Sequence, residues 1–96
     1  MRTVKLMSDY GCHALWEASL GEVGNIDPAS LPISADLQHA LALWAECYDR
    51  TLNQDDPRAS GFASDEEEAL FKSKGLSLAA RLRDELGHGY TVTVHL

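Results

Sequence analysis

The chain has 96 residues, of which 45% are hydrophobic and 24% are charged, and 15 Asp and Glu face 8 Lys and Arg. This length suits one domain, and the composition is that of a globular protein rather than a disordered one. The net charge of −7 disfavours binding to nucleic acid or to an anionic membrane and favours a basic protein partner.

The sequence has no apolar run of about 18 residues, the length that a membrane-spanning helix requires. The N-terminal segment is too short and too polar to be a signal peptide. We therefore expect a cytoplasmic protein in which Cys12 and Cys47 are reduced thiols, because disulfides are rare in that compartment.

Both ends of the sequence show the alternation that is typical of β-strands. In residues 3–8, two aliphatic side chains alternate with more polar positions, which predicts a short strand. In residues 90–96 the alternation is stronger, and the glycine-rich turn at 87–89 introduces it. The strand predicted there places on one face Tyr90, Val92, Val94 and Leu96.

The segment from residue 9 to residue 33 is irregular. Residues 12–20 could form a short helix that carries Leu15 and Trp16, and repeated Gly and Pro residues break the chain after it. Loops of this length in small domains are often functional. The segment is therefore a candidate for binding.

Two amphipathic helices are predicted, over residues 34–52 and 64–86. The first has Ser34 as its N-cap, and the second has a capping box formed by Ser64 and Glu67. Their apolar stripes follow helical spacing, with Leu37, Leu41, Trp44, Tyr48 and Leu52 on the first helix and Phe71, Leu78, Leu82 and Leu86 on the second. Gly75 lies on the second stripe, where it would allow close approach of the first helix. The connection over residues 53–63 is expected to be an exposed turn.

These elements predict an α/β fold, with α+β as the alternative: one small two-layer domain over residues 1–96, in which two terminal strands pack on a helical hairpin. If residues 12–20 are helical, the additional reversal of the chain between the strands favours a parallel pair. Without that helix the pair would be antiparallel. A two-stranded sheet has only edges, so a homodimer through a strand edge is a further expectation.

No motif for catalysis or metal binding is recognisable. Cys12 and His13 beside Asp9 could combine a nucleophile with a base, but adjacent side chains usually diverge. His39 and Cys47 would lie about 12 Å apart along one helix at 1.5 Å per residue, too far to share a metal ion. We therefore predict no catalytic residues, no metal and no cofactor.

Acidic and aromatic side chains form the candidate partner-binding surface. The run that opens the second helix complements the helix dipole, and it also extends a negative patch from the preceding connection. Aromatic residues among acids in the irregular segment suit interface anchors, with core packing as the competing role of Trp16. The predicted partner-binding residues are Asp9, Tyr10, Trp16, Glu17, Glu22, Asp55, Asp56, Asp65, Glu66 and Glu68.

The chain carries Met7-Ser8-Asp9-Tyr10-Gly11-Cys12 and Leu15-Trp16, followed by Val23-Gly24-Asn25-Ile26-Asp27 and Leu31-Pro32. In these stretches it resembles small bacterial proteins without an assigned activity. In size, charge and architecture it is also similar to immunity proteins of bacterial polymorphic toxin systems, including contact-dependent growth inhibition. That resemblance implies a cytosolic protein that binds and neutralises a toxin domain, often a basic nuclease.

The leading hypothesis is thus an immunity protein, or antitoxin, whose partner is a basic toxin domain. A homo-oligomeric adaptor or regulatory subunit is the first alternative, and a stable dimer without a toxin partner would favour it. A small enzyme that uses residues 9–16 is the second. Turnover that survives substitution of Cys12, His13 and Asp9 would eliminate it.

Overall fold

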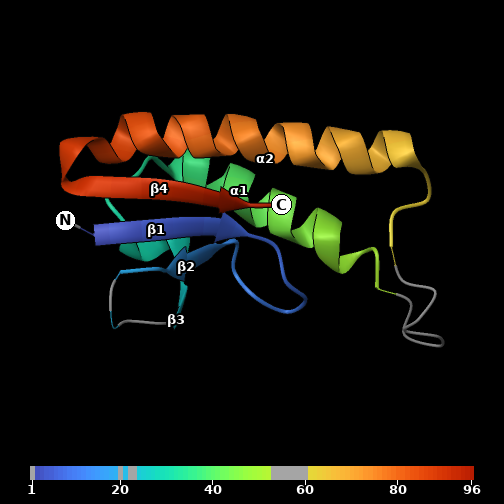
Figure 1. Cartoon of the computed structure of the whole chain (residues 1–96), viewed down its shortest axis with the longest axis horizontal. Helices are drawn as coiled ribbons and strands as arrows, with labels where there is room; N and C mark the ends of the chain where they lie inside the picture. Colours follow the sequence, from blue (N-terminus) through green and yellow to red (C-terminus); the bar gives the residue numbers. More distant parts are fainter. Residues whose placement is uncertain (1, 20, 22–23, 53–60) are drawn as a thin grey trace.

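The fold is a four-stranded mixed sheet with two helices on one of its faces, an α+β arrangement (Figure 1). The computed structural model describes residues 2–19, 21, 24–52 and 61–96. The strands are β1 (Arg2–Met7), β2 (Leu15–Glu17), β3 (Gly24–Ile26) and β4 (Tyr90–His95), and the helices are α1 (Ala35–Asp49) and α2 (Asp65–Leu86). Two short 3-10 helices, η1 (Pro28–Ser30) and η3 (Gly87–Gly89), precede α1 and β4.

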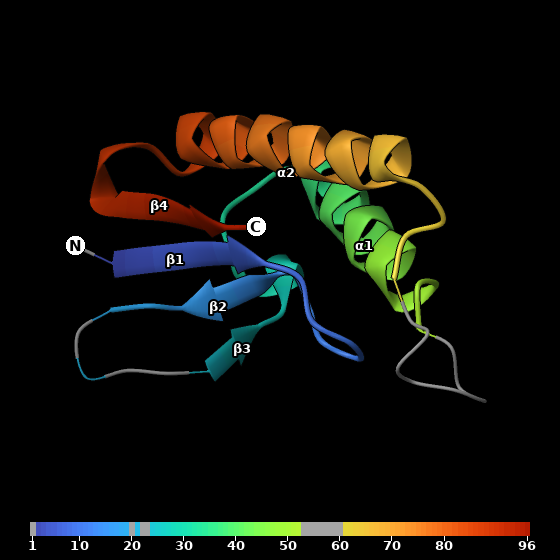
Figure 2. The ribbon, with the colours of Figure 1, turned by 45° about the vertical axis from the view of Figure 1, so that its right-hand side comes forward.

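The strand order is β3-β2-β1-β4, so the first strand of the chain lies inside the sheet and the last strand forms one edge. β1 pairs antiparallel with β2 and parallel with β4, which joins Leu6 to Leu15 on one side and to Val94 on the other. Figure 2 shows α2 running along β4, with α1 beside it. The predicted parallel pair and the helical hairpin are confirmed.

Both predicted strands are present, but the sheet has four strands rather than two, and the prediction of a short helix at residues 12–20 is wrong. Leu15–Glu17 form β2 instead, and β3 follows it. The chain therefore changes direction through two antiparallel strand pairs, not through a helix, before it enters α1. The physical reason is the hairpin with β1: Gly11 turns the chain at φ 71°, and the indole Nε1 of Trp16 donates to the Met7 carbonyl at 3.0 Å. Three residues are too few for an alternation to be visible in the sequence.

Asn25 fixes the register between β2 and β3 with its side chain. Its Oδ1 accepts from the His13 amide at 2.8 Å, and its Nδ2 donates to the carbonyls of His13 and Leu15. The side-chain amide thus extends a strand that has only three residues, and the irregular segment becomes part of the sheet.

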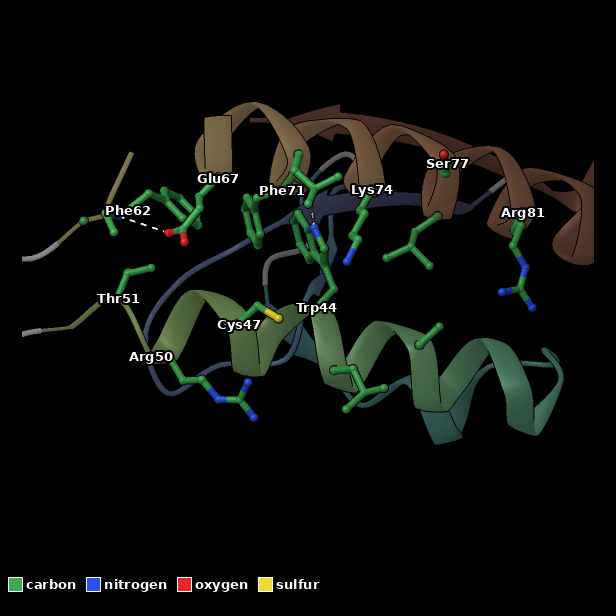
Figure 3. Close-up of a pocket in the computed structure, with 16 residues that line it drawn as sticks. Trp44, Cys47, Arg50, Thr51, Phe62, Glu67, Phe71, Lys74, Ser77 and Arg81 are labelled. Atoms are coloured by element: carbon green, nitrogen blue, oxygen red, sulfur yellow. Dashed lines mark hydrogen bonds between the residues drawn. The ribbon is translucent and has the colours of Figure 1, made fainter. Parts of the chain in front are cut away.

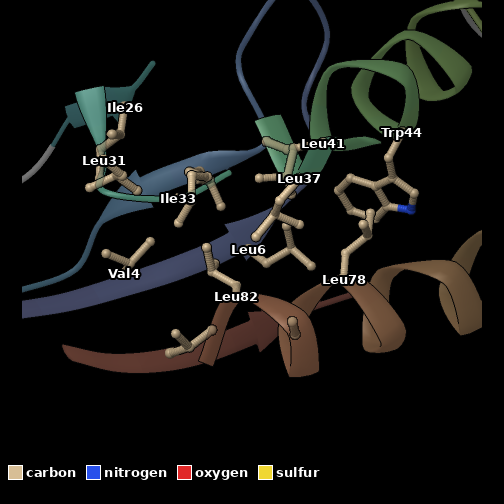
Figure 4. Close-up of a cluster of buried hydrophobic side chains, with 14 of the residues drawn as sticks. Val4, Leu6, Ile26, Leu31, Ile33, Leu37, Leu41, Trp44, Leu78 and Leu82 are labelled. Carbon is tan, nitrogen blue, oxygen red and sulfur yellow. The ribbon is translucent and has the colours of Figure 1, made fainter. Parts of the chain in front are cut away.

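The core lies between the sheet and the helices (Figure 4). Val4 and Leu6 of β1 are fully buried, and they face Leu37 and Leu41 of α1 and Leu82 of α2. Each such aliphatic side chain stabilises the fold by about 1.5–3 kcal/mol. The predicted apolar stripes are therefore core, except that Tyr48 is only partly buried against it and that Leu52 lies beyond the end of α1 and is exposed.

Both helices begin where the sequence predicts. Ser34 Oγ accepts from the Leu37 amide, and Ser64 Oγ accepts from the Glu67 amide. In a complete capping box the Glu67 carboxylate would accept from the Ser64 amide. Here its Oε2 accepts instead from the Ala63 amide at 3.2 Å. α1 ends at Asp49, three residues earlier than predicted, where Thr51 Oγ1 donates to the Tyr48 carbonyl.

Gly75 provides the close approach that its position on the stripe predicts. A Cβ built there would lie 2.9 Å from Cζ2 of Trp44 and 3.1 Å from Cδ2 of Leu96. Trp44 cannot move away cheaply, because its ring stacks on Phe71 at 4.4 Å and its Nε1 donates to the Phe71 carbonyl.

Gly75→Ala is therefore expected to destabilise the fold by about 1–3 kcal/mol, as overpacking does. On helix propensity alone the same change would stabilise by up to about 1 kcal/mol, so the sign of the effect decides which cause dominates. Urea unfolding measures the change, with the exposed substitution Ser73→Ala as control. A more stable Gly75→Ala protein would contradict the tight Trp44 contact.

A side chain of α2 forms hydrogen bonds to the backbone of the edge strand β4. Arg83 donates from Nε at 3.4 Å and from Nη2 at 3.2 Å to the carbonyl of Val92. A carbonyl that is already bonded offers less to an incoming strand, and natural sheets protect their edges by such means. The strand-edge homodimer remains a prediction, and this contact disfavours β4 as its edge.

Candidate functional site

The loop after β1, the end of α1 and the start of α2 meet at one end of the molecule (Figures 1 and 2). The Gly11 amide donates to Asp49 Oδ1 at 3.0 Å, which ties the loop to α1, and the Gly61 amide donates to the Thr51 carbonyl at 2.9 Å. We call this surface the acidic end, and it comprises Asp9, Glu46, Asp49, Asp65, Glu66, Glu67 and Glu68.

A chain of aromatic rings supports the acidic end from inside. Tyr10 stacks on Tyr48 with ring centroids 4.6 Å apart, and Phe62 connects Tyr48 to Phe71. The Tyr10 hydroxyl also lies 2.9 Å from Thr51 Oγ1. Burial raises the pKa of the Tyr48 phenol above its ordinary value, and the neighbouring Tyr10 adds to this rise. These contacts hold the loop firmly against the helices.

Within the described residues, most carboxylates of the acidic end have no cation partner. Arg50 pairs with Glu46 at 2.8 Å, and Lys72 pairs with Glu68 at 3.4 Å. Among the residues that the structure describes, the others make no ion pair, and they are Asp9, Asp49, Asp65, Glu66 and Glu67. The first turn of α2 favours its acids through the helix dipole, which adds to their local stability. The result is a concentrated negative field on one end.

The structure brings together half of the predicted partner-binding residues. Asp9 and Tyr10 lie in the loop, and Asp65, Glu66 and Glu68 open α2 at the same end. Glu22, Asp55 and Asp56 fall outside the described residues. Glu46 and Asp49 were not among the predicted residues, although the helix periodicity of α1 places them away from the buried stripe of Leu41 and Trp44.

Trp16 and Glu17 lie elsewhere, on β2. Trp16 pairs with Lys5 across the sheet and is half-buried on the face away from the helices. Glu17 accepts from Ser19 Oγ at 2.7 Å and from Arg2 Nε at 2.8 Å, and these bonds lower the pKa of its carboxyl below the ordinary value. The Glu17 carboxylate is thus bonded to other residues of this chain.

Of the residues considered for catalysis, Cys12 and His13 line one pocket beside α1, and Asp9 is not among the residues that line it. Cys12 is half-buried, and the backbone of the neighbouring His13 is bonded on both sides by Asn25. No group of three His, Cys, Asp or Glu side chains able to hold a metal occurs within the described ranges. Neither α1 nor α2, the helices resolved in the described part of the chain, is long and apolar enough to cross a bilayer.

The fold and the acidic end describe a small α+β protein whose surface suits the binding of another protein. A family model for Serratia CdiI immunity protein-like proteins matches residues 2–95. The chain therefore belongs to the Serratia CdiI immunity protein-like family, and the resemblance to immunity proteins of contact-dependent growth inhibition is confirmed. The comparison with curated proteins found no match.

Proposed function

We propose that this immunity protein binds a basic toxin domain through its acidic end and thereby blocks the toxin inside the cell. The observation that carries the proposal is the group of five carboxylates without a cation partner among the described residues, gathered from a loop and two helix ends. A field of this sign attracts a positively charged surface and repels nucleic acid.

A toxin that acts on nucleic acid fits this surface best. Such an enzyme binds its substrate through Lys and Arg side chains that contact phosphates. The carboxylates of the acidic end would take the place of those phosphates and exclude the substrate. Tyr10, half-exposed and held by Tyr48, would supply a rigid aromatic contact beside them.

The test uses the purified cognate toxin domain. Calorimetry should give a one-to-one complex whose affinity falls between low and high salt, because exposed charge pairs are screened. Co-expression should restore growth to cells that make the toxin domain. Absence of binding at both salt concentrations, with no protection of growth, would reject the proposal.

A further inference from the structure

A groove runs between α1 and α2, the two helices of the hairpin (Figure 3). It has a volume of about 720 Å³, and Trp44 and Phe71 line it from the two helices. Two leucines that line it, Leu43 and Leu70, remain 47% and 56% exposed. An apolar groove with exposed leucines at its border is the type of surface that partners cover.

The residues that line the groove follow helical contact spacing on both sides. On α2 they recur every three or four positions, and on α1 the same spacing holds from Ala40 to Arg50. The stretch from Glu67 to Arg81 is about 20 Å long at 1.5 Å per residue. Two helices that offer such stripes to one groove are shaped to receive a third helix.

The charge of the groove is opposite to that of the protein. Arg50, Lys74 and Arg81 line it, although the chain has a net charge of −7, and Arg50 is already paired with Glu46 at 2.8 Å. Lys74 has no ion-pair partner in the part of the chain that the structure describes, and Arg81 approaches Glu85 only to 3.9 Å. Glu67 is the one acid among the lining residues described, and its carboxylate already accepts from the Ala63 amide.

From the apolar stripes and from the two cations Lys74 and Arg81 we infer that the groove binds an amphipathic helical segment of the toxin. This segment carries large apolar side chains toward Trp44 and Phe71, flanked by Asp or Glu that meet Lys74 and Arg81. The inference rests on the proposed function. It adds a second contact of opposite charge, which would select the cognate toxin among other basic proteins.

Cys47 allows a direct test of occupancy, because its thiol is exposed and lines the groove. In a Cys12→Ser background, alkylation of Cys47 by iodoacetamide should slow about tenfold or more when the toxin domain binds, since interface cores exclude solvent. The control adds Leu76→Cys to Cys12→Ser and Cys47→Ser, and it places a thiol on α2, the other helix of the groove, at a position 57% exposed that does not line the groove. Its alkylation should not change.

For a charge substitution in the groove, this inference and the proposed function predict opposite changes in affinity for the toxin domain. Lys74→Glu makes the protein more acidic, so attraction to a basic toxin alone would tighten binding. Occupancy by an acidic helix predicts instead that Kd rises about tenfold or more, as it does when an interface anchor is lost. The matched control Lys72→Glu lies two residues away and outside the lining, and it should bind as tightly as the wild type or more tightly.

The outcomes are distinct. A complex that forms and protects growth while Cys47 stays fully reactive, or while Lys74→Glu binds like Lys72→Glu, overturns the groove inference alone. Failure of the wild-type chain to bind the toxin domain overturns the proposed function, and this inference with it. Slower alkylation together with weaker binding of Lys74→Glu supports both.

Discussion

Replacing Asp65 and Glu66 together with lysine should slow association with the toxin domain about tenfold or more at low salt, since steering by complementary charge changes on-rates by that order. Both side chains are exposed at the start of α2, and neither has an ion-pair partner within the described residues. Stopped-flow measurement of the association rate tests the expectation, and the difference should shrink as salt rises.

The matched control reverses two acids at the opposite end of the helices, with Asp36→Lys and Asp84→Lys. Both are exposed, and the double substitution changes the net charge by the same amount. If this control slows association as much as the Asp65 and Glu66 substitutions do, only total charge matters and the acidic end is not the binding surface. Thermal unfolding of both variants should show that each remains folded.

Trp44→Ala is expected to cost about 3–5 kcal/mol of the free energy of unfolding, the range for large aromatic residues in a core. Trp44 is 3% exposed, stacks on Phe71 with the planes within 5° of parallel, and fits against Gly75. Small domains are stable by only about 5–15 kcal/mol, so this loss is a large share of the total. Urea unfolding followed by circular dichroism gives the value.

Leu76→Ala is the control, because Leu76 lies on α2 in solvent and its removal should change stability by less than about 0.5 kcal/mol. Trp44→Phe keeps an aromatic ring but loses the bond from Nε1 to the Phe71 carbonyl, and it should fall between the two. A Trp44→Ala protein as stable as the Leu76→Ala protein would show that the hairpin does not depend on this ring.

The sequence predicts best the elements whose signals are local. α2 has a cap at Ser64, a long apolar stripe and a glycine at its end, so its limits could be read almost to the residue. In β4, apolar and polar residues alternate over six positions. Its pairing with β1 could be predicted because β1 is the other strand that the sequence indicates. The three-residue strands β2 and β3 have no such signal, because they depend on tertiary pairing: β2 pairs with β1, and β3 pairs with β2 with the help of the Asn25 side chain.

The candidate site divides in the same way. The acids that open α2 are neighbours in sequence, and the helix dipole alone suggests that they cluster. That Asp9 and Tyr10 join them depends on the stack with Tyr48, 38 positions further along the chain. The groove was not predicted, because helical periodicity gives the apolar face of each helix but not how far apart the two helices lie.

The pairing of Arg2 with Tyr90 has a consequence for the time at which the protein becomes able to act. These partners are 88 positions apart, and contacts of such long range are slow to form. Synthesis delivers the chain from its N-terminus at about 5–20 residues per second, so β1 exists for seconds before β4 can pair with it. Until then α2 lacks the strand to which Arg83 fastens it. On the proposed function, only completed copies can therefore bind the toxin, because a chain still being made lacks one edge of the sheet.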